Sequence, residues 1–238
     1  DVAFFATPPV DGVFQEYVAH PESFCFKLPE HVSTLEGALI EPLSVGFHAV
    51  RQGDAHVGQS VVVFGAGCIG LVTMMALKAC GISKVYVVDI MEKRLEKAIE
   101  LGAAGVINAS LTDVSESARQ ITKGEGFDLA VETAGTEITV NQAIEVVRKG
   151  SNIVLVGYGK TGKMNLSMSL ALDKELTFKT VFRYRHIYPI AIEAVAEGKV
   201  DLKGIVTHIF DFRDIQRAMD ESMKDKSRIV KAVVKIAE

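Results

Sequence analysis

The sequence predicts an α/β fold in which a doubly wound, mostly parallel sheet is covered by helices on both faces. Three observations predict it. Val61 to Phe64 is a short apolar run rich in β-branched residues, which is typical of a strand covered on both faces. A glycine turn follows this run directly. Segments of strand length then alternate with segments of helix length up to about residue 159, and this alternation favours a parallel sheet.

The composition limits the classes of function. The chain has 238 residues, a net charge of −4 and 48% hydrophobic residues, which indicates one large or two modest domains without the basic surplus of a nucleic-acid-binding protein. No run reaches transmembrane length and no signal peptide is visible. We therefore expect a cytoplasmic protein with neither a nucleic acid nor a membrane as partner. Cys25, Cys68 and Cys80 lack the pair spacing of metal sites.

The first part of the chain predicts short strands and then helices. Strands are expected at residues 13–19 and 25–28. Ser33-Thr-Leu-Glu36 is a capping-box signature in front of a helical stretch. Pro42 is expected to end or bend that helix and to open a second one from Leu43 to about Gln52.

The glycine turn predicts a nucleotide site. Gly65, Gly67 and Gly70 have the spacing of a dinucleotide-binding turn. In such a turn the first glycine makes the bend, the second lets a pyrophosphate approach the backbone, and the third lets helix and strand pack closely. A helix is expected at residues 71–80, with its positive end toward the phosphate.

A carboxylate follows at the end of the next predicted strand. Residues 84–89 end on Asp89, about 20 residues after the turn, where such sites hold a ribose 2′-hydroxyl. The alternative is a structural strand–turn–helix in which Asp89 caps a helix, and the turn and the carboxylate together favour binding. Asp89 favours NAD over NADP because it would repel a 2′-phosphate. Arg94 complicates this preference because an arginine there can accommodate a phosphate.

The rest of the chain continues the alternation. Further helices are expected at residues 92–101, 115–123, 137–148, 188–197 and 212–224. Further strands are expected at residues 106–107, 127–131, 152–156, 176–182, 206–210 and 229–236.

Several stretches together carry a family resemblance. They are Ala6-Thr-Pro-Pro9 with Asp11-Gly12, Gly37 to Gly46, Gly65 to Gly70, Val181-Phe-Arg-Tyr184, and Val206-Thr-His208. With them the chain resembles the zinc-dependent medium-chain dehydrogenases, in particular the sorbitol (polyol) dehydrogenase branch. The resemblance covers the C-terminal two-thirds of such an enzyme, so we expect a truncated or processed chain that lacks the N-terminal part of the catalytic domain.

The resemblance implies two domains. A Rossmann domain that binds NAD would span residues 42–181. Residues 1–41 and 182–238 would form a partial GroES-like, β-rich catalytic domain. The region that supplies the cysteine and the His–Glu pair of the family's catalytic zinc site, and the four-cysteine structural zinc lobe, has no counterpart in this chain.

The resemblance also implies site residues. Glu41 matches the carboxylate at the catalytic zinc, and Arg183 matches an arginine near the substrate. Without the resemblance, a solvated helix carboxylate and a surface arginine are the favoured interpretations. Phe4, Thr7 and Tyr184 match the substrate pocket. The NAD-binding residues would be Gly65, Gly67, Cys68, Ile69, Gly70, Asp89, Arg94, Thr133, Gly135, Val156, Gly157, Phe182 and Arg183. Zinc needs three or four protein ligands, so with Glu41 alone its site is incomplete.

The leading hypothesis is an NAD-dependent, zinc-type oxidoreductase that transfers hydride between NAD and a sugar alcohol of the sorbitol or xylitol kind. The resemblance implies a homodimer or homotetramer, and we expect impaired turnover in this fragment. The alternative is a catalytically silent NAD-binding or assembly module. A methyltransferase-like fold is disfavoured because Phe64 stands where such turns carry an acidic residue. Zinc analysis with a polyol oxidation assay distinguishes the first two.

Overall fold

The chain divides into two compact units. The computed structural model describes residues 4–159, 161–225 and 228–236. The smaller unit comprises Asp1–Lys27 and Val206–Glu238, and the larger one Leu28–Ile205. The nucleotide domain predicted at residues 42–181 lies wholly within the larger unit, and its boundaries stay a prediction.

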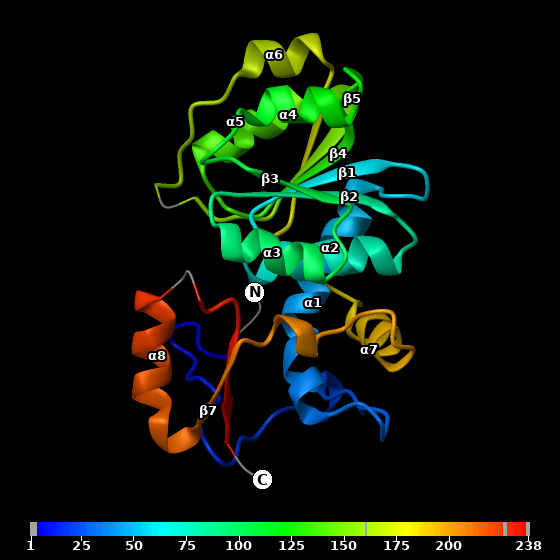
Figure 1. Cartoon of the computed structure of the whole chain (residues 1–238). Coiled ribbons are helices and arrows are strands. Elements are labelled where there is room, and N and C mark those ends of the chain that lie inside the picture. The colour runs from blue at the N-terminus through cyan, green and yellow to red at the C-terminus, as the bar shows by residue number, and fades with distance from the viewer. Residues whose placement is uncertain (1–3, 160, 226–227, 237–238) are drawn as a thin grey trace. The chain divides into compact units, whose positions relative to one another are not determined.

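The larger unit contains a parallel sheet, which confirms the doubly wound α/β prediction (Figure 1). Its order is β3-β2-β1-β4-β5-β6, so the connections reverse direction between β1 and β4. All neighbouring strands are parallel. The strands are β1 (Ser60–Phe64), β2 (Lys84–Asp89), β3 (Gly105–Asn108), β4 (Phe127–Glu132), β5 (Val147–Leu155) and β6 (Thr177–Thr180).

Helices cover both faces of this sheet, as the apolar character of β1 requires. Val61, Val62, Val63 and Phe64 are all 0% exposed, because successive side chains of a strand point to opposite faces and both are covered. One face carries α1 (Thr34–Gly53), α2 (Cys68–Ala79) and α3 (Glu92–Glu100) (Figure 1). The other carries α4 (Val114–Ile121), α5 (Glu137–Val146) and α6 (Met168–Asp173). In addition, α7 (Tyr188–Ala196) packs against α1.

The prediction that one helix ends at Pro42 and a second begins at Leu43 is wrong. Helix α1 begins after the Ser33 cap, whose capping box with Glu36 is present, and runs through Pro42 to Gly53. Proline inside a helix costs about 3 kcal/mol. Here Leu39 and Leu43 are 0% exposed on either side of Pro42, and α1 packs along α2. Burial of this apolar face offsets the lost hydrogen bond, which local sequence does not reveal.

The strands predicted at residues 13–19 and 25–28 are also wrong. In the described part of the N-terminal segment the structure has a bridge between Thr7 and Val10 and a 3-10 turn at Glu22–Phe24. Tyr17 is 88% exposed. The apolar residues here have strand character, but a strand requires a partner to pair with, and the described residues provide none for these segments.

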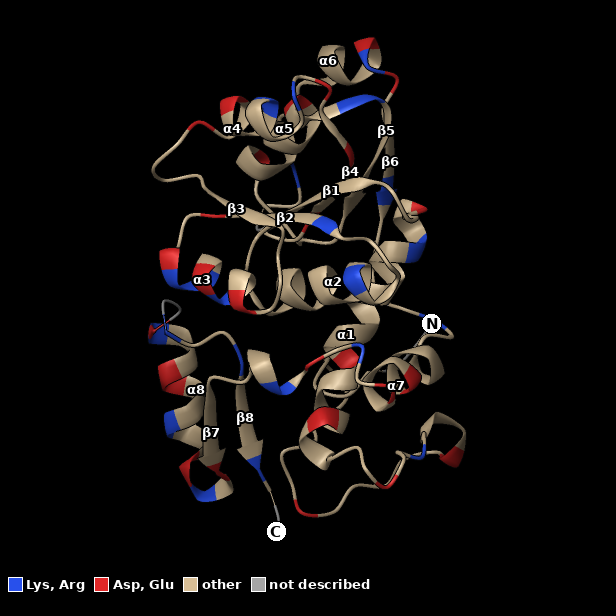
Figure 2. Ribbon diagram, turned by 45° about the vertical axis from the view of Figure 1, so that its right-hand side comes forward, with Lys and Arg blue, Asp and Glu red and all other residues tan. Residues whose placement is uncertain are grey.

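The smaller unit contains a parallel pair of strands. Strands β7 (His208–Asp211) and β8 (Ala232–Lys235) pair in parallel, with α8 (Ile215–Lys224) between them in the sequence. Both strands and the helix were predicted, with ends displaced by a few residues. Helix α8 carries both basic and acidic residues (Figure 2), and Arg217 pairs with Glu221 at 2.9 Å.

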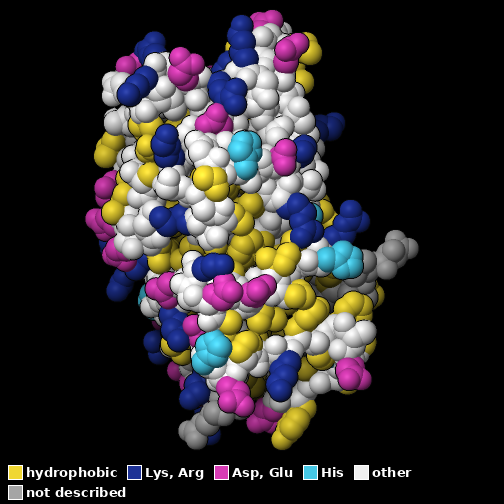
Figure 3. Space-filling view, turned by 90° about the vertical axis from the view of Figure 1, so that its right-hand side faces the viewer, with side chains coloured by type: hydrophobic (Ala, Val, Ile, Leu, Met, Phe, Trp, Pro, Cys, Tyr) yellow, Lys and Arg dark blue, Asp and Glu magenta, His cyan; other side chains and the backbone are white. Residues whose placement is uncertain are grey.

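The surface mixes charges of both signs. On the face shown in Figure 3, Lys and Arg side chains (dark blue) are interspersed with Asp and Glu side chains (magenta), so their fields partly cancel. Among the described residues, no helix has both the length and the apolar character needed to cross a bilayer.

Candidate functional site

The glycine turn lies at the carboxyl edge of the sheet, defined here as the edge where β1, β2, β4 and β5 end. Gly65 N donates to Val88 O at 2.7 Å, and its φ of +97° favours glycine. A Cβ at Gly65 would lie 2.8 Å from Thr133 Oγ1, and one at Gly70 would lie 1.7 Å from Gly65 O. The backbone of α2 therefore approaches β1 as closely as the turn motif requires.

The middle glycine faces open space at the start of α2. Gly67 is the N-cap of this helix, which begins with Cys68 and Ile69, and among the described residues no side chain caps it. A Cβ at Gly67 would find one neighbour within 4 Å, Arg94 Nη1 at 3.8 Å. The amino-terminal end of a helix carries a positive partial charge. Together with the Arg94 guanidinium, the residues present thus fit a pyrophosphate.

Asp89 connects the glycine turn to α3. Its Oδ2 accepts from Ala66 N at 2.7 Å, and its Oδ1 accepts from Met91 N at 2.9 Å. Met91, not Asp89, is the N-cap of α3, so the alternative role of Asp89 as that helix's cap is not seen. A carboxylate offers about four lone-pair positions, and two backbone bonds leave capacity for the hydroxyls of a ribose.

The ends of β4 and β5 lie beside the turn. Thr133 Oγ1 donates to Phe64 O at 2.7 Å, which ties β4 to the end of β1. Val156 N and Gly157 N both donate to Glu132 O, at 2.8 and 3.0 Å. Gly135 has a φ of +69°. The structure therefore gathers Thr133, Gly135, Val156 and Gly157 at the carboxyl edge, where the sequence predicted a nucleotide.

Glu132 is a residue of this edge that sequence reasoning missed. It is 1% exposed, and its Oε1 accepts from Ala134 N, Gly135 N and Thr139 Oγ1, each at 2.8 Å. Burial raises the pKa of this carboxyl, although those hydrogen bonds oppose the rise. The signal that could have found it is a carboxylate at the end of a buried strand, directly before a glycine turn.

Phe182 and Arg183 follow β6 at the same edge. Val181 N donates to Leu155 O at 2.9 Å, which extends the pairing with β5 up to this point. The Arg183 guanidinium lies 5.8 Å from the centroid of the Phe182 ring, and Phe182 is 70% exposed. Both residues thus stand where the chain leaves the sheet next to β5.

Glu41 and Tyr184, predicted for different roles, contact each other directly. Tyr184 Oη donates to Glu41 Oε1 at 2.9 Å, and Tyr188 Oη lies 3.2 Å from Tyr184 Oη. The two tyrosine rings meet edge to face, with centroids 5.4 Å apart. Burial raises the pKa of Tyr184, and Tyr188 and Glu41 add to that rise. Tyr188, the first residue of α7, was not predicted, because its role depends on contact with Tyr184 in the loop before that helix.

The residues present do not fit a zinc ion. Within residues 4–159, 161–225 and 228–236, no group of three or more His, Cys, Asp and Glu side chains could hold a metal. Glu41 accepts a hydrogen bond from Tyr184 and does not belong to a cluster of metal ligands among these residues.

Two predicted substrate residues belong to the smaller unit. Thr7 forms an antiparallel bridge with Val10, whose N donates to Thr7 O at 2.9 Å. Phe4 is partly buried. Their substrate role stays a prediction.

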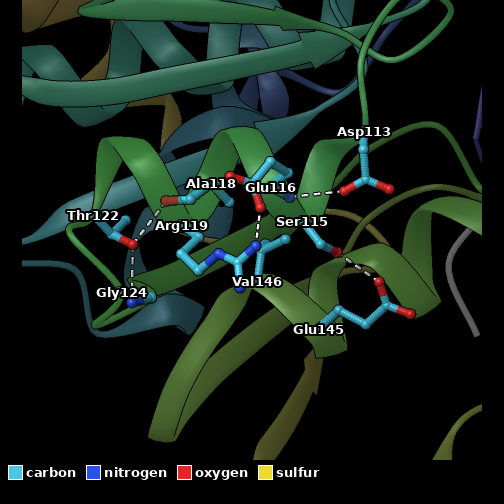
Figure 4. A pocket seen from close by; sticks show the side chains of 10 residues that line it. Asp113, Ser115, Glu116, Ala118, Arg119, Thr122, Gly124, Glu145 and Val146 are labelled. Atoms are coloured by element: carbon cyan, nitrogen blue, oxygen red, sulfur yellow. Dashed lines mark hydrogen bonds and ion pairs between the residues drawn. The ribbon is translucent and has the colours of Figure 1, made fainter.

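A cavity of about 310 Å³ lies along α4 (Figure 4). Its polar side chains are bonded within the cluster: Arg119 pairs with Glu116, and Ser115 Oγ donates to Glu145 Oε2 at 2.7 Å. Asp113 Oδ1 accepts from Glu116 N at 2.7 Å and so caps α4. None of the predicted cofactor residues lines this cavity, so the carboxyl edge is the better candidate site.

Comparison with known sequences identifies relatives along the whole chain. The family model described as zinc-binding dehydrogenase matches residues 68–197. The uncharacterized zinc-type alcohol dehydrogenase-like protein YdjJ of Escherichia coli is 44% identical, over 100% of this chain and 68% of that protein. Sorbitol dehydrogenase of Arabidopsis thaliana is 39% identical, over 96% of this chain and 64% of that protein. The chain thus spans about two thirds of the length of such relatives.

Solved structures agree with these matches. An oxidoreductase/dehydrogenase of unknown specificity from Escherichia coli has a TM-score of 0.96 at 44% identity, covering 100% of this chain and 68% of that one. An alcohol dehydrogenase from Escherichia coli CFT073, complexed with NADH, has a TM-score of 0.88 at 28% identity, covering 94% of this chain and 66% of that one. The chain therefore belongs to the zinc-dependent medium-chain dehydrogenases, in their sorbitol dehydrogenase-like branch.

Proposed function

We propose that this chain carries the cofactor site of an NAD-dependent oxidoreductase that transfers hydride between NAD and a polyol or related alcohol. The observation that carries the proposal is the position of Asp89. Its carboxylate accepts from Ala66 N at 2.7 Å inside the glycine turn, so the group that would hold a ribose and the turn that would hold a pyrophosphate are one connected unit.

Different residues of the carboxyl edge bind different parts of the cofactor. Asp89 binds the adenosine ribose, and the start of α2 with the Arg94 guanidinium binds the pyrophosphate. Because Arg94 Nη1 lies near Gly67, its charge serves the pyrophosphate that NAD and NADP share, and selectivity for NAD rests on Asp89. Val156, Gly157 and Phe182 flank the nicotinamide half. When bound, NAD supplies the acceptor for the hydride.

The substrate class comes from the relatives. Those that match include proteins named sorbitol dehydrogenase and D-xylulose reductase A, which supports a sugar alcohol and its ketose as the reacting pair. Glu41, fixed by Tyr184, is the candidate group at the alcohol, and Arg183 the candidate substrate contact. We extend the proposal to a homodimer or homotetramer in the cytoplasm, which sedimentation and fractionation of the natural protein test.

A second candidate function is nucleotide binding without turnover. It is favoured by one observation: the described residues provide Glu41 but no cluster with it that could hold a metal. Zinc analysis and a sorbitol or xylitol oxidation assay on the same preparation separate the two. Bound NAD without zinc and without turnover supports the silent module, whereas polyol-dependent NADH formation supports the oxidoreductase.

The cofactor proposal is tested by titrating NADH and NADPH into the chain and following nicotinamide fluorescence. Asp89→Ala should weaken NADH binding about tenfold or more, since it removes charge-assisted hydrogen bonds to the ribose. It should also narrow the gap between NADH and NADPH. Glu96→Ala is the matched control, because Glu96 is an exposed carboxylate on α3. Unchanged selectivity in Asp89→Ala would contradict the role of this residue.

A further inference from the structure

Glu132 lies where two loops of the carboxyl edge meet. Its side-chain Oε1 accepts from Ala134 N and Gly135 N in the loop after β4, both at 2.8 Å. Its main-chain oxygen accepts from Val156 N and Gly157 N in the loop after β5, at 2.8 and 3.0 Å. One residue therefore holds both loops, one through its side chain and the other through its backbone.

The two loops approach each other too closely for side chains. A Cβ at Gly157 would lie 2.1 Å from Gly135 N and 2.8 Å from Glu132 Oε2. A Cβ at Gly135 would lie 2.6 Å from Tyr158 O. The backbones at Gly135 and Gly157 are thus in direct contact, with the Glu132 carboxyl beside them.

Burying the Glu132 carboxyl costs more free energy than burying an apolar side chain at the same position would. The residue is 1% exposed, and within the described part of the chain its Oε2 has no hydrogen-bond partner. A buried polar atom without a partner costs free energy, so an apolar residue would suit a buried strand end better. What the carboxyl adds is the acceptor Oε1, which serves three donors at once.

The sheet order indicates which half of a dinucleotide these loops face. The connections reverse between β1 and β4, and a dinucleotide spans the crevice at such a point with one half on each side. Asp89 follows β2 on one side and is the ribose-binding group of the adenosine half. The loops held by Glu132 follow β4 and β5 on the other side, so they face the nicotinamide half.

We infer that Glu132 is a positioning residue, which holds the loops at residues 133–135 and 156–158 together so that they bind the nicotinamide half of the cofactor. The inference rests on the proposed function. Glu132 contacts the loops rather than the cofactor: its Oε1 holds the loop after β4, and its main-chain oxygen holds the loop after β5.

The test compares NADH with AMP, which carries the adenosine half alone. Titration calorimetry on the full chain should show NADH binding weakened about tenfold or more in Glu132→Ala, with AMP affinity equal to that of the wild type. Glu132→Gln keeps an acceptor at Oε1 and should restore NADH affinity to within about threefold. A merely structural role would lower both ligands' affinities together, so the difference between NADH and AMP is the decisive readout.

Gly157→Ala supplies a second route if Glu132→Ala does not fold. Its Cβ would push the two loops apart while the carboxylate stays, so it should weaken NADH binding and spare AMP. Asp128→Asn, at the other end of the same strand, is the control and should bind both ligands as the wild type does. Equal loss of AMP and NADH, or unchanged NADH affinity in the folded variants, overturns the inference. A wild-type chain that binds neither ligand overturns the proposed function as well.

Discussion

Strand β4 carries a carboxylate near each of its ends, and the two are used differently. At the amino end, Asp128 Oδ2 accepts from Ser60 N at 2.7 Å and Ser60 Oγ at 2.8 Å, while Oδ1 accepts from Arg148 Nε at 2.7 Å. At the carboxyl end, Glu132 Oε1 accepts from two backbone donors of the following loop and from Thr139 Oγ1 on α5, and Oε2 has no hydrogen-bond partner among the described residues. The amino end is closed by internal pairing, and the carboxyl end is built around turns.

The pKa values of the two carboxyls move in opposite directions. Burial alone would raise the pKa of Asp128, but its bonds with Ser60 and Arg148 outweigh that effect and hold it below its usual range. Burial raises the pKa of Glu132, and its hydrogen bonds do not compensate. The Asp128 carboxylate pairs with the Arg148 guanidinium and stabilises the fold, whereas the Glu132 carboxyl accepts from the loop after β4, at the edge proposed to bind the cofactor.

The largest effect should come from filling the glycine turn. Gly70→Ala places a Cβ 1.7 Å from Gly65 O, so the start of α2 must move away from β1. We expect a loss of about 3 kcal/mol in the free energy of unfolding, measured by urea denaturation, together with loss of NADH binding. Gly124→Ala is the control for backbone strain without a clash, because Gly124 has a φ of +89° and a Cβ there has no neighbour within 4 Å. It should cost about 1 kcal/mol and leave NADH binding unchanged. A loss in Gly70→Ala no larger than this would contradict the close approach of α2 to β1.

Next in size is the removal of the Asp128 charge. Asp128→Asn should lower the free energy of unfolding by about 2 kcal/mol at pH 7, because it weakens charge-assisted hydrogen bonds. The folded-state pKa of Asp128 is depressed, so its stabilisation is present above the ordinary aspartate pKa of about 3.9 and is lost as pH falls through the folded-state value. The difference between variant and wild type should therefore shrink in acid. A difference that is constant with pH would contradict this.

Glu132→Gln should have a smaller effect with the opposite pH dependence. We expect the free energy of unfolding to change by about 1 kcal/mol. Because the folded-state pKa of Glu132 is raised, the wild type loses stability as pH rises from the ordinary glutamate pKa of about 4.3 through the raised value. The glutamine does not titrate, so the free energy of unfolding of the variant should rise relative to the wild type over that interval. A relative fall would reverse the assignment of the two ends.

The smallest effect on stability should come from the tyrosine pair beside Glu41, a third carboxylate, which is exposed. Tyr188→Phe removes the hydroxyl that lies 3.2 Å from Tyr184 Oη, and it should cost about 0.5 kcal/mol in thermal or urea unfolding. Tyr184→Phe removes the bond to Glu41 itself and should cost more. If Tyr188→Phe proves the more damaging of the two, the bond between Tyr184 and Glu41 is not the larger contribution to stability.

Local signals predicted the parts of the fold that local physics determines. The apolar run at residues 61–64, the glycine turn and Asp89 all lie where the sequence placed them, because strand burial and turn geometry are properties of short segments. Pro42 was misread because helix α1 is held by packing against α2, which no local pattern shows. Glu132 was missed because Gly157, which donates to its main-chain oxygen, is distant in the sequence. Tyr188 was missed because its partner Tyr184 is itself bonded to the distant Glu41.

The most direct test of the difference between the two edges is the change in backbone amide NMR signals when NADH is added to the isotopically labelled chain. We predict shifts at Ala66, Gly67, Gly135 and Gly157 on the carboxyl edge, with the signal of Ser60 on the amino edge unchanged. Addition of AMP should shift the first two and spare the last two of those carboxyl-edge signals. Shifts centred on Ser60, or none at any of these amides at saturating NADH, would contradict the assignment of the carboxyl edge as the cofactor site.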